Sequence, residues 1–478
     1  MDLSPSVRKP IHNSIAQKIE SDNWIRNGLV NRLHAGQREL LKFYQSTTSR
    51  KIVLECSRRF GKSTLLVCIG LLMGYAKPRS RIIYAAPTRK QAKNIVLPLL
   101  RELVKDAPAQ LQPTFHAQDM KYIIPNEQGD SEMYIDGADD DMGNHLRGPK
   151  ADLILIDEYG FWRYCKYVVD SVLFPQTITC NGRIILASTP SESVGHESLE
   201  YISEAMREGN YQKRIIYDNP MLTESDIEEI AKELGGYEST AFRRECLCEH
   251  VTDAGRAIIP EFQELKPDIV VKDVKPPLFF DAYVFMDLGL IDYTHVLFAW
   301  YHFEMAQLII EDELCFTYKT TAEVAKAIIA KEQELWPNKK VTLRISDNDS
   351  QQLQDLSVSH KLDFAPAQKH DPNEDVKTNQ LRRMIRDKKI LINERCTQLI
   401  FQLEVGIWNM RRSDYERIPG AGHLDGMDAL RYGIRLVDYN KDPIPKNYGL
   451  RLETHNIRGQ QGGSHYEKAL RKYGLHVK

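Results

Sequence analysis

The chain has 478 residues, which a prior of roughly 150 residues per domain divides into about three units. Hydrophobic residues make up 42% and charged residues 27%, values typical of soluble globular proteins, which excludes a wholly disordered chain and a fibre. The longest apolar run, Leu65–Ala76, is shorter than the ~20 residues that cross a bilayer. There is no charged start followed by an apolar stretch and a cleavage site. We therefore expect a cytoplasmic protein without a membrane partner.

The charges nearly cancel, with 64 Lys and Arg against 66 Asp and Glu, so composition gives no indication of nucleic-acid binding. A local basic stretch, residues 381–389, is compatible either with DNA contacts or with a solvated helix face. Eight cysteines in so long a chain indicate reduced thiols and no disulfide framework. Cys246, Cys248 and His250 lack the second ligand pair that a zinc site needs, which favours buried packing residues.

From residue 51 onward, short apolar runs alternate with helical patterns. The runs are four to six residues long and rich in Ile, Leu and Val, as expected for strands buried on both faces. The predicted strands are Lys51–Cys56, Arg81–Ala86, Met133–Asp136, Leu153–Asp157 and Arg183–Ser188, with helices at Ser63–Tyr75 and Thr88–Val104. This alternation predicts a parallel sheet with helices on both sides.

A polar and mainly helical stretch follows at residues 198–250, and the proline-rich residues 255–277 read as an interdomain connection. A second strand-rich region then begins. Its predicted strands are Ala282–Leu288, Thr294–Tyr301, Gln307–Leu314 and Val341–Ser346, and its clearest helices are Thr321–Leu335 and Asp425–Leu436. Three antiparallel-looking strands followed by alternating units predict a mixed α/β fold.

The strongest local motif is Cys56–Thr64, which follows an apolar strand and precedes an apolar helix, the context of a phosphate-binding loop. In such a loop, backbone N–H groups bind phosphate oxygens at the helix N-terminus. Lys62 would reach the β- and γ-phosphates of ATP, and the Ser63 hydroxyl would help to hold Mg²⁺. Cys56 stands where the usual pattern has its first glycine. The predicted nucleotide-binding residues of the loop are Ser57, Arg58, Arg59, Gly61, Lys62, Ser63 and Thr64.

Two further strand ends carry polar groups. Leu153–Asp157 delivers Asp157 to the Mg²⁺ shell, and Glu158 follows where it can orient and deprotonate the attacking water. The alternative is a core strand that runs into a solvated acidic turn. The phosphate loop upstream makes this alternative less favoured, because it supplies the context in which such acids bind Mg²⁺ and water. Ser188 and Thr189 end another apolar strand, where they could sense the γ-phosphate. Their alternative is a simple Ser-Thr-Pro turn.

The second half of the chain places acids at the ends of predicted elements. Asp287 lies within an apolar strand, where a lone carboxylate is costly unless it is paired or binds metal. Asp347 ends another strand, and Asp425 and Asp428 stand at i and i+3 of one helix. These acids could converge on two divalent cations that cleave a phosphodiester bond. An N-cap role is the alternative for Asp425, and Asp349 reads as a turn residue.

Together these motifs resemble the large subunit of the terminase, the DNA-packaging motor of tailed double-stranded DNA bacteriophages. That family has a deviant phosphate loop of the Ser-Arg-x-x-Gly-Lys-[Ser/Thr] type, which accounts for Cys56. By this resemblance, Arg58 stabilises the transferring phosphate and Gln37 recognises adenine. Ser188 and Thr189 couple hydrolysis to DNA movement, and Arg147 is a candidate arginine finger acting in trans.

The order of acids in the second half resembles a ribonuclease H-like nuclease, the fold joined to the packaging ATPase in terminases. Asp287, Asp347 and Asp428 match the three acids of that family, and Asp425 occupies a neighbouring position that some members use for metal. The resemblance thus implies an α/β protein with a P-loop ATPase built on a parallel-type central sheet and a mixed α/β nuclease domain. The expected limits are ATPase 1–254 (with a helical lid or linker at about 200–254), connection 255–278, nuclease 279–439 and flexible tail 440–478.

The function implied is ATP-driven translocation of double-stranded DNA into a procapsid, with Mg²⁺- or Mn²⁺-dependent cutting of concatemeric DNA. The implied partners are DNA, the small terminase subunit and the capsid portal protein. The protein would be a monomer alone and a homo-oligomeric ring on the procapsid, in the host cytoplasm and absent from the mature virion. Two alternatives stay open: a helicase-like repair ATPase with a resolvase-type nuclease, and a non-enzymatic assembly adaptor.

Overall fold

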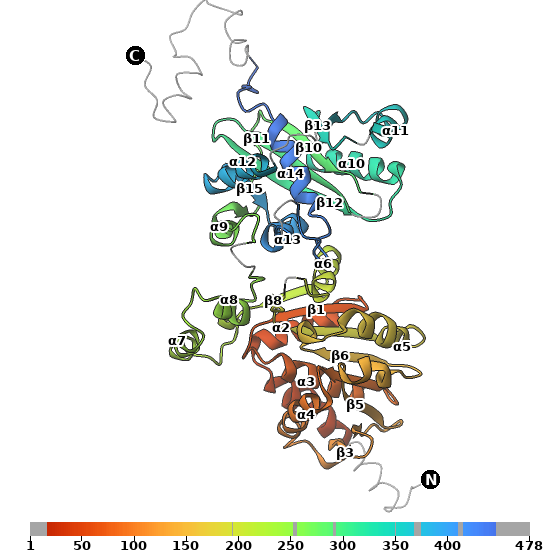
Figure 1. Cartoon of the computed structure of the whole chain (residues 1–478). Coiled ribbons are helices and arrows are strands. Elements are labelled where there is room, and N and C mark those ends of the chain that lie inside the picture. Colours follow the sequence, from red (N-terminus) through yellow and green to blue (C-terminus); the bar gives the residue numbers. More distant parts are fainter. Residues whose placement is uncertain are drawn as a thin grey trace, which may run out of the picture. The chain divides into compact units, whose positions relative to one another are not determined.

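The computed structural model describes residues 17–193, 195–251, 256–289, 293–348, 350–367, 374–409 and 414–445 (Figure 1). Contacts within the chain divide it into two compact units. The first consists of Met1–Gln263 and Thr397–Met427, and the second of Glu264–Cys396 and Asp428–Lys478. The change of unit after residue 263 lies inside the expected connection 255–278, whereas residues 397–427, expected within 279–439, pack with the first unit. Most of the expected tail, residues 446–478, and Asp349 lie outside the described residues.

The first unit is built on an eight-stranded sheet in the order β3-β4-β5-β2-β6-β7-β1-β8. The six strands from β5 to β8 in this order are parallel, and β4 and β3 extend the β5 edge in antiparallel fashion. The strands are β1 Lys51–Cys56, β2 Arg81–Ala86, β3 Thr114–His116, β4 Lys121–Ile124, β5 Ser131–Gly137, β6 Leu153–Asp157, β7 Arg183–Ser188 and β8 Tyr211–Arg214.

Strands β1, β2, β6 and β7 have the predicted bounds because their Ile, Leu and Val side chains are buried on both faces. The stretch at 198–250 is mainly helical, as expected, but it also contains β8, which was not predicted. The β8 sequence, Tyr-Gln-Lys-Arg, is polar and half-buried, and it forms a strand because it pairs with β1 at the sheet edge. The short strands β3 and β4 were not predicted either, since β3 is mostly exposed and lacks an apolar run.

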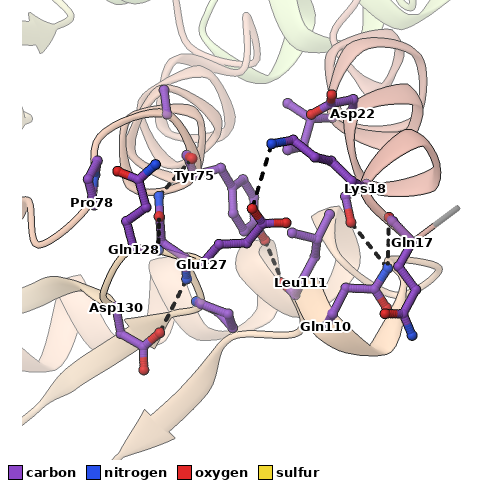
Figure 2. A pocket seen from close by; sticks show the side chains of 15 residues that line it. Gln17, Lys18, Asp22, Tyr75, Pro78, Gln110, Leu111, Glu127, Gln128 and Asp130 are labelled. Atoms are coloured by element: carbon purple, nitrogen blue, oxygen red, sulfur yellow. Dashed lines mark hydrogen bonds and ion pairs between the residues drawn. The ribbon is translucent and has the colours of Figure 1, made fainter. Parts of the chain in front are cut away.

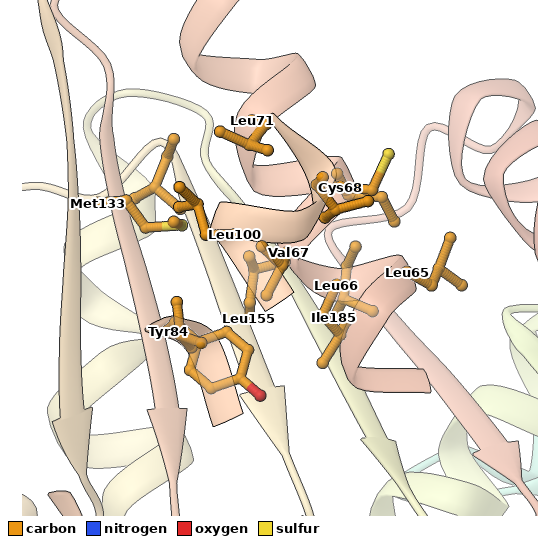
Figure 3. Close-up of a cluster of buried hydrophobic side chains, with 14 of the residues drawn as sticks. Leu65, Leu66, Val67, Cys68, Leu71, Tyr84, Leu100, Met133, Leu155 and Ile185 are labelled. Atoms are coloured by element: carbon orange, nitrogen blue, oxygen red, sulfur yellow. The ribbon is translucent and has the colours of Figure 1, made fainter. Parts of the chain in front are cut away.

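Helices cover the sheet of the first unit, and most residues of α3 are buried. Leu65, Leu66, Val67 and Leu71 of α3 pack with Tyr84, Leu155 and Ile185 of the sheet (Figure 3). This helix is apolar on nearly all sides, as expected for one enclosed by other elements. The α-helices of this unit are α2 Ala35–Ser46, α3 Lys62–Ala76, α4 Arg89–Leu103, α5 Pro175–Ile178, α6 Ser198–Glu208, α7 Glu224–Glu233, α8 Thr240–Leu247 and α13 Thr397–Val405.

Short 3₁₀ and π segments connect these elements. They are η1 Trp24–Leu29, η2 Val30–Arg32, η3 Ala109–Leu111, η4 Asp140–Leu146, η5 Tyr159–Phe161, η6 Tyr167–Leu173 and η7 Ile216–Asp218. Within the described residues of the chain, no helix is both long enough and apolar enough to cross a membrane.

The second unit contains a seven-stranded sheet in the order β14-β13-β10-β11-β12-β15-β9. Strand β11 is antiparallel to β10 and β12, and β13, β14, β15 and β9 are added in parallel pairings. The strands are β9 Val270–Val271, β10 Asp281–Asp287, β11 Thr294–His302, β12 Gln307–Phe316, β13 Leu343–Ser346, β14 Ala365–Pro366 and β15 Ile390–Asn393. Counted along the chain from β10, the neighbours β12-β11-β10-β13-β14 have the 3-2-1-4-5 order of a ribonuclease H-like sheet, which confirms the predicted fold class.

Helices pack on both faces of this second sheet. Side chains of α10 and of alternate residues of β10 and β11 form one core cluster, which includes Val284, Met286, Phe298 and Ile328. On the other face, α14 approaches so closely that a Cβ added to Gly433 would lie 2.3 Å from the Phe285 ring of β10. The α-helices of this unit are α9 Phe262–Ile269, α10 Thr321–Leu335, α11 Ser350–His360, α12 Glu374–Arg386 and α14 Asp425–Leu436; α9 and α14 begin just before the change of unit.

Candidate functional site

The polar groups predicted to bind ATP meet at one edge of the first sheet. Strands β6, β7 and β1 are parallel neighbours, so their carboxyl ends lie side by side. The phosphate loop follows β1, Asp157 ends β6 and Ser188 ends β7. In open α/β sheets, ligands bind outside the carboxyl ends of the strands.

The phosphate loop is held in its conformation by backbone bonds and by Gln37. The Ser57 and Arg58 N–H groups donate to the carbonyls of Arg214 and Glu245, at 2.9 and 2.7 Å. Gly61 has φ +89°, and a Cβ added there would lie 2.5 Å from Gln37 Nε2. Because that amide donates to the Gly61 carbonyl at 2.7 Å, glycine is required by both conformation and space.

Gln37 itself is buried, 3% exposed, and completes a capping box at the start of α2. Its Oε1 accepts from the His34 N–H at 2.9 Å, and the His34 ring bonds the Phe60 carbonyl at 2.8 Å. The structure therefore places Gln37 against the loop, with its amide engaged by the loop backbone. Its predicted contact with adenine stays a prediction.

Lys62 and Glu158 form an ion pair at the centre of the site. The Lys62 ammonium lies 2.9 Å from a Glu158 carboxylate oxygen. Burial lowers the pKa of Lys62, but the charges of Glu158 and then Asp157 outweigh it, so the pKa lies above its ordinary value. Glu158 occupies the left-handed region, with φ 54°, which turns its side chain away from the direction of the β6 strand.

Asp157 is fully buried behind this pair. Its Oδ2 accepts the Ser63 hydroxyl at 2.6 Å and the hydroxyl of Tyr84. Its Oδ1 is buried without a hydrogen-bond partner among the described residues. Burial, reinforced by the charge of Glu158, raises the pKa of Asp157.

A divalent cation fits this arrangement. Asp157 Oδ1 lacks a partner among the described residues, the Ser63 hydroxyl is already beside the same carboxylate, and both are oxygen ligands of the type that Mg²⁺ prefers. A cation here would also oppose the burial that raises the pKa of Asp157.

Ser188 connects the end of β7 to Glu158. Its hydroxyl donates to Glu158 Oε2 at 3.3 Å and accepts the Gly160 N–H at 3.2 Å. Thr189 is buried beside it at 3% exposure. Of the predicted coupling pair, Ser188 is therefore in contact with the predicted catalytic glutamate.

The remaining predicted residues of this unit are exposed or half-buried. Arg58 and Arg59 are exposed, and Thr64 is half-buried in the first turn of α3. Arg147 is exposed and donates to the Tyr167 hydroxyl at 3.0 Å and, more weakly, to Asn144. The structure brings Arg147 to none of the described catalytic residues of its own chain, which leaves the role in trans as a prediction.

The predicted nuclease acids Asp287 and Asp347 end neighbouring strands. Met286 of β10 pairs in parallel with Ser346 of β13, so Asp287 and Asp347, the residues that follow this pair, lie at adjacent strand ends. Asp347 is 3% exposed, and its Oδ1 accepts the Ser346 hydroxyl at 3.2 Å.

Asp428 comes to the same region from α14. Its Oδ1 accepts from Arg431 at 2.8 Å, one turn along the helix. Burial, and then the carboxylates of Asp428, Asp287 and Asp347, raise the pKa of the Tyr432 phenol. The phenol therefore lies within electrostatic reach of all three predicted acids. Asp425 begins α14 and is 5% exposed.

Three carboxylates at two strand ends and a helix are a suitable donor set for Mg²⁺ or Mn²⁺. Among the described residues, however, no three His, Cys, Asp or Glu side chains are already close enough together to hold a metal ion. The metal-binding roles of Asp287, Asp347, Asp425 and Asp428 therefore stay predictions.

Several residues that support these sites were not predicted. Tyr84 on β2 bonds Asp157, and nothing in the apolar run Arg81–Ala86 distinguishes it from a core aromatic. Glu55, 1% exposed, accepts the Tyr211 hydroxyl and lies 3.1 Å from His250. A carboxylate next to Cys56 in an apolar strand was the available signal for this buried pair.

The prediction of buried packing residues is confirmed for Cys246, which lies in a cluster with Ile216, Ile227 and Phe242. Burial raises the pKa of the Cys246 thiol to about 11. Cys248 is buried as well, and His250 is engaged by Glu55.

A pocket of about 520 Å³ lies away from the phosphate loop, between residues 17–25 and the turn at 125–130 (Figure 2). Lys18 and Glu127 face each other across it at 3.7 Å. Its described lining includes none of the predicted site residues.

Comparison with known proteins agrees with the motifs. Residues 53–265 match the family model of the terminase large subunit N-terminal domain of the T4likevirus type. The large terminase subunit of Escherichia phage T5 is 24% identical over 457 residues, which cover 91% of this chain and 95% of the relative.

Solved structures of large terminases are also similar. The large terminase of a thermophilic bacteriophage in complex with ADP has 16% identity and a TM-score of 0.41, over 84% of this chain and 99% of that one. The large terminase of bacteriophage HK97 has 16% identity and a TM-score of 0.41, over 84% and 94%. These TM-scores are below 0.5, so the fold assignment depends on the strand orders above. Residues 53–265 therefore match the model of terminase large subunit N-terminal domains, and the resemblance of the chain to large terminase subunits is confirmed.

Proposed function

We propose that this protein is a viral DNA-packaging motor that hydrolyses ATP in its first unit and cuts DNA in its second. The observation that carries the proposal is the convergence of Lys62, Glu158, Asp157 and Ser63 at one sheet edge. A chain with this site, a ribonuclease H-like second unit and relatives among large terminases has the parts of such a motor.

ATP hydrolysis would begin with the exchange of partners at Lys62. The γ-phosphate of ATP competes with Glu158 for the Lys62 ammonium, while the loop N–H groups bind the phosphate oxygens. Glu158 is then free to orient a water molecule and accept its proton as the water attacks the γ-phosphorus. Ser63 and Asp157 would hold Mg²⁺, which neutralises charge on the phosphate oxygens.

The contact between Ser188 and Glu158 supports a role for Ser188 and Thr189 in coupling. A movement of Glu158 on nucleotide binding would alter its hydrogen bond to Ser188, and the end of β7 would then respond to the nucleotide. Arg58 from the loop, and Arg147 from a neighbouring subunit, would stabilise the charge of the transferring phosphate.

In the second unit, Asp287, Asp347 and Asp428 would hold Mg²⁺ or Mn²⁺, and Asp425, which begins the α14 helix that carries Asp428, is the further proposed ligand. Bound cations would activate water and stabilise the leaving 3′ oxygen of the DNA strand. The proposed partners are double-stranded DNA, the small terminase subunit and the capsid portal protein. The proposed location is the host cytoplasm, with transient docking as a homo-oligomeric ring on the procapsid and no place in the mature virion.

The test compares plasmid cleavage by the wild type and by Asp428→Asn, each with Mn²⁺, Mg²⁺ or EDTA and without ATP. We expect metal-dependent cutting that is lost in EDTA and in the variant. ATP turnover with and without double-stranded DNA is measured on the same samples, and DNA should stimulate it. Absence of cutting with every metal would reject the nuclease half, and absence of ATP turnover would reject the motor.

A further inference from the structure

His295 lies at the edge of the second sheet where the predicted nuclease acids are found. It lies directly opposite Asp287 in the antiparallel pairing of β10 with β11. Directly opposed residues of an antiparallel pair project on the same face, with Cβ atoms roughly 4.5–5.5 Å apart. His295 and Asp287 thus share one face of the sheet, and Asp347 follows β13 directly, next to the end of β10.

Glu313 of β12 holds the His295 ring. The His295 Nε2 lies 2.8 Å from Glu313 Oε2, and the two side chains are 0% and 7% exposed. An ionised carboxylate can only accept a hydrogen bond, so Nε2 carries the proton. In the neutral ring Nδ1 then has a lone pair and no proton.

The Nδ1 atom of His295 is unusual because it is buried and has no hydrogen-bond partner among the described residues. A buried unpaired polar atom costs free energy unless something binds to it. A histidine whose second nitrogen is fixed by a carboxylate is the usual arrangement of a histidine that binds metal.

We propose that His295 Nδ1 is a further ligand of the divalent-metal site of the second unit, and that it biases this site toward Mn²⁺ over Mg²⁺. The inference rests on the proposed nuclease function, because Asp287 is taken as a metal ligand. An imidazole nitrogen suits transition metals, whereas Mg²⁺ prefers oxygen ligands. Glu313 is then a positioning residue that fixes the tautomer.

The experiment is pulsed electron paramagnetic resonance of Mn²⁺ bound to the full-length protein without nucleotide. Electron spin-echo modulation detects a nitrogen nucleus bonded directly to Mn²⁺. We expect ¹⁴N modulation from one imidazole, replaced by the ¹⁵N pattern when only the histidines are labelled with ¹⁵N. This readout requires neither a variant nor activity.

Variants then assign the signal to one residue. His295→Gln should remove the nitrogen modulation and weaken Mn²⁺ binding by about 10-fold or more, while Mg²⁺ binding changes less. His302→Gln is the matched control, because His302 ends the same strand, and it should keep both properties. Circular dichroism and the apparent Tm establish that each variant is folded.

The outcomes separate the two proposals. If Mn²⁺ binds, and Asp287→Asn abolishes this binding, but no histidine nitrogen couples to it, His295 is not a ligand and the nuclease site stands. If His295→Gln keeps the modulation, the inference is also wrong. If no bound Mn²⁺ is sensitive to Asp287→Asn, the proposed nuclease function itself fails.

Discussion

In the first unit, the Lys62 ammonium already lies 2.9 Å from Glu158, and the Ser63 hydroxyl lies 2.6 Å from Asp157. In the second unit, Asp347 and Asp428 accept hydrogen bonds from Ser346 and Arg431, and the described residues include no assembled metal-ligand group. The two sites differ in the charges of their parts. A lysine, N–H groups and two acids attract one another, whereas several carboxylates repel until a cation is present.

This difference shows which site depends on an added ion for its geometry. The ATP site is organised by hydrogen bonds and one ion pair of the chain itself, so single substitutions should act mainly on chemistry and nucleotide binding. The acid site should be more sensitive to metal, and its variants should change metal binding together with cutting. The following substitutions examine this comparison.

The largest expected effect is that of Lys62→Ala on ATP turnover. The variant loses the cation that would bind the transferring phosphate and leaves Glu158 and Asp157 near each other without compensation. We expect a decrease in ATP turnover of about 10³-fold, with metal-dependent plasmid cutting retained. A phosphate-release assay measures it.

Lys93→Ala is the matched control, because Lys93 is an exposed lysine of the same unit, and its turnover should equal that of the wild type. Unchanged ATP turnover in Lys62→Ala would contradict the assignment of the phosphate loop. Loss of cutting in the same variant would contradict the independence of the two sites.

For Asp287→Asn we expect the opposite pattern, which is loss of plasmid cutting with ATP turnover retained. Replacing one charged oxygen ligand should reduce plasmid cutting about 10²-fold or more, and ATP turnover should stay within about twofold of the wild type. Cutting is measured over a range of Mn²⁺ concentrations, since a metal-dependent site should be partly rescued at high metal. Asp363→Asn, an exposed acid of the same unit, is the control. If the variant still cuts plasmid at low Mn²⁺ concentration, Asp287 is not a metal ligand.

The central strands of both sheets could be predicted because their sequences are apolar on both faces. Strands such as β6 and β10 are buried along nearly their whole length, and the hydrophobic effect leaves them few other arrangements. Strand β8 could not be predicted, because its polar residues are ordered by pairing with β1, and that partner is distant in the sequence.

The same distinction holds for the sites. Lys62 and Asp157 belong to motifs whose spacing along the chain is informative, and the structure brings them together as predicted. Tyr84 and His295 are single residues of apolar strands, and only the register of the sheets places them near the acids. The spacing of residues along the sequence does not show which residues become neighbours across strands.

Gly61→Ala and Gly209→Ala measure how far the phosphate loop is organised in advance. Both glycines have positive φ, 89° and 71°, which costs another residue roughly 1–2 kcal/mol. A Cβ at Gly209 meets nothing within 4 Å, whereas one at Gly61 would meet the Gln37 amide at 2.5 Å. We expect Gly61→Ala to weaken binding of a fluorescent ATP analogue by about 10-fold, and Gly209→Ala to lower only the apparent Tm. Equal nucleotide affinities would mean that the loop is not held by Gln37.

The smallest expected effect concerns the buried pair of Glu55 and His250 next to the loop. Burial raises the pKa of Glu55, but His250, with Lys213 and Tyr211, outweighs it, so the folded pKa lies below the ordinary value of 4.5. A lowered carboxyl pKa stabilises the fold above the unfolded value, and this stabilisation is lost as the pH falls from 4.5 through the folded pKa. Glu55→Gln should therefore lower the apparent Tm by a few degrees at neutral pH and flatten its decline below about pH 4.5. Glu39→Gln, at an exposed glutamate, is the control and should leave the dependence of the apparent Tm on pH unchanged. Parallel pH curves of Tm for Glu55→Gln and the wild type would show that His250 does not stabilise the Glu55 charge.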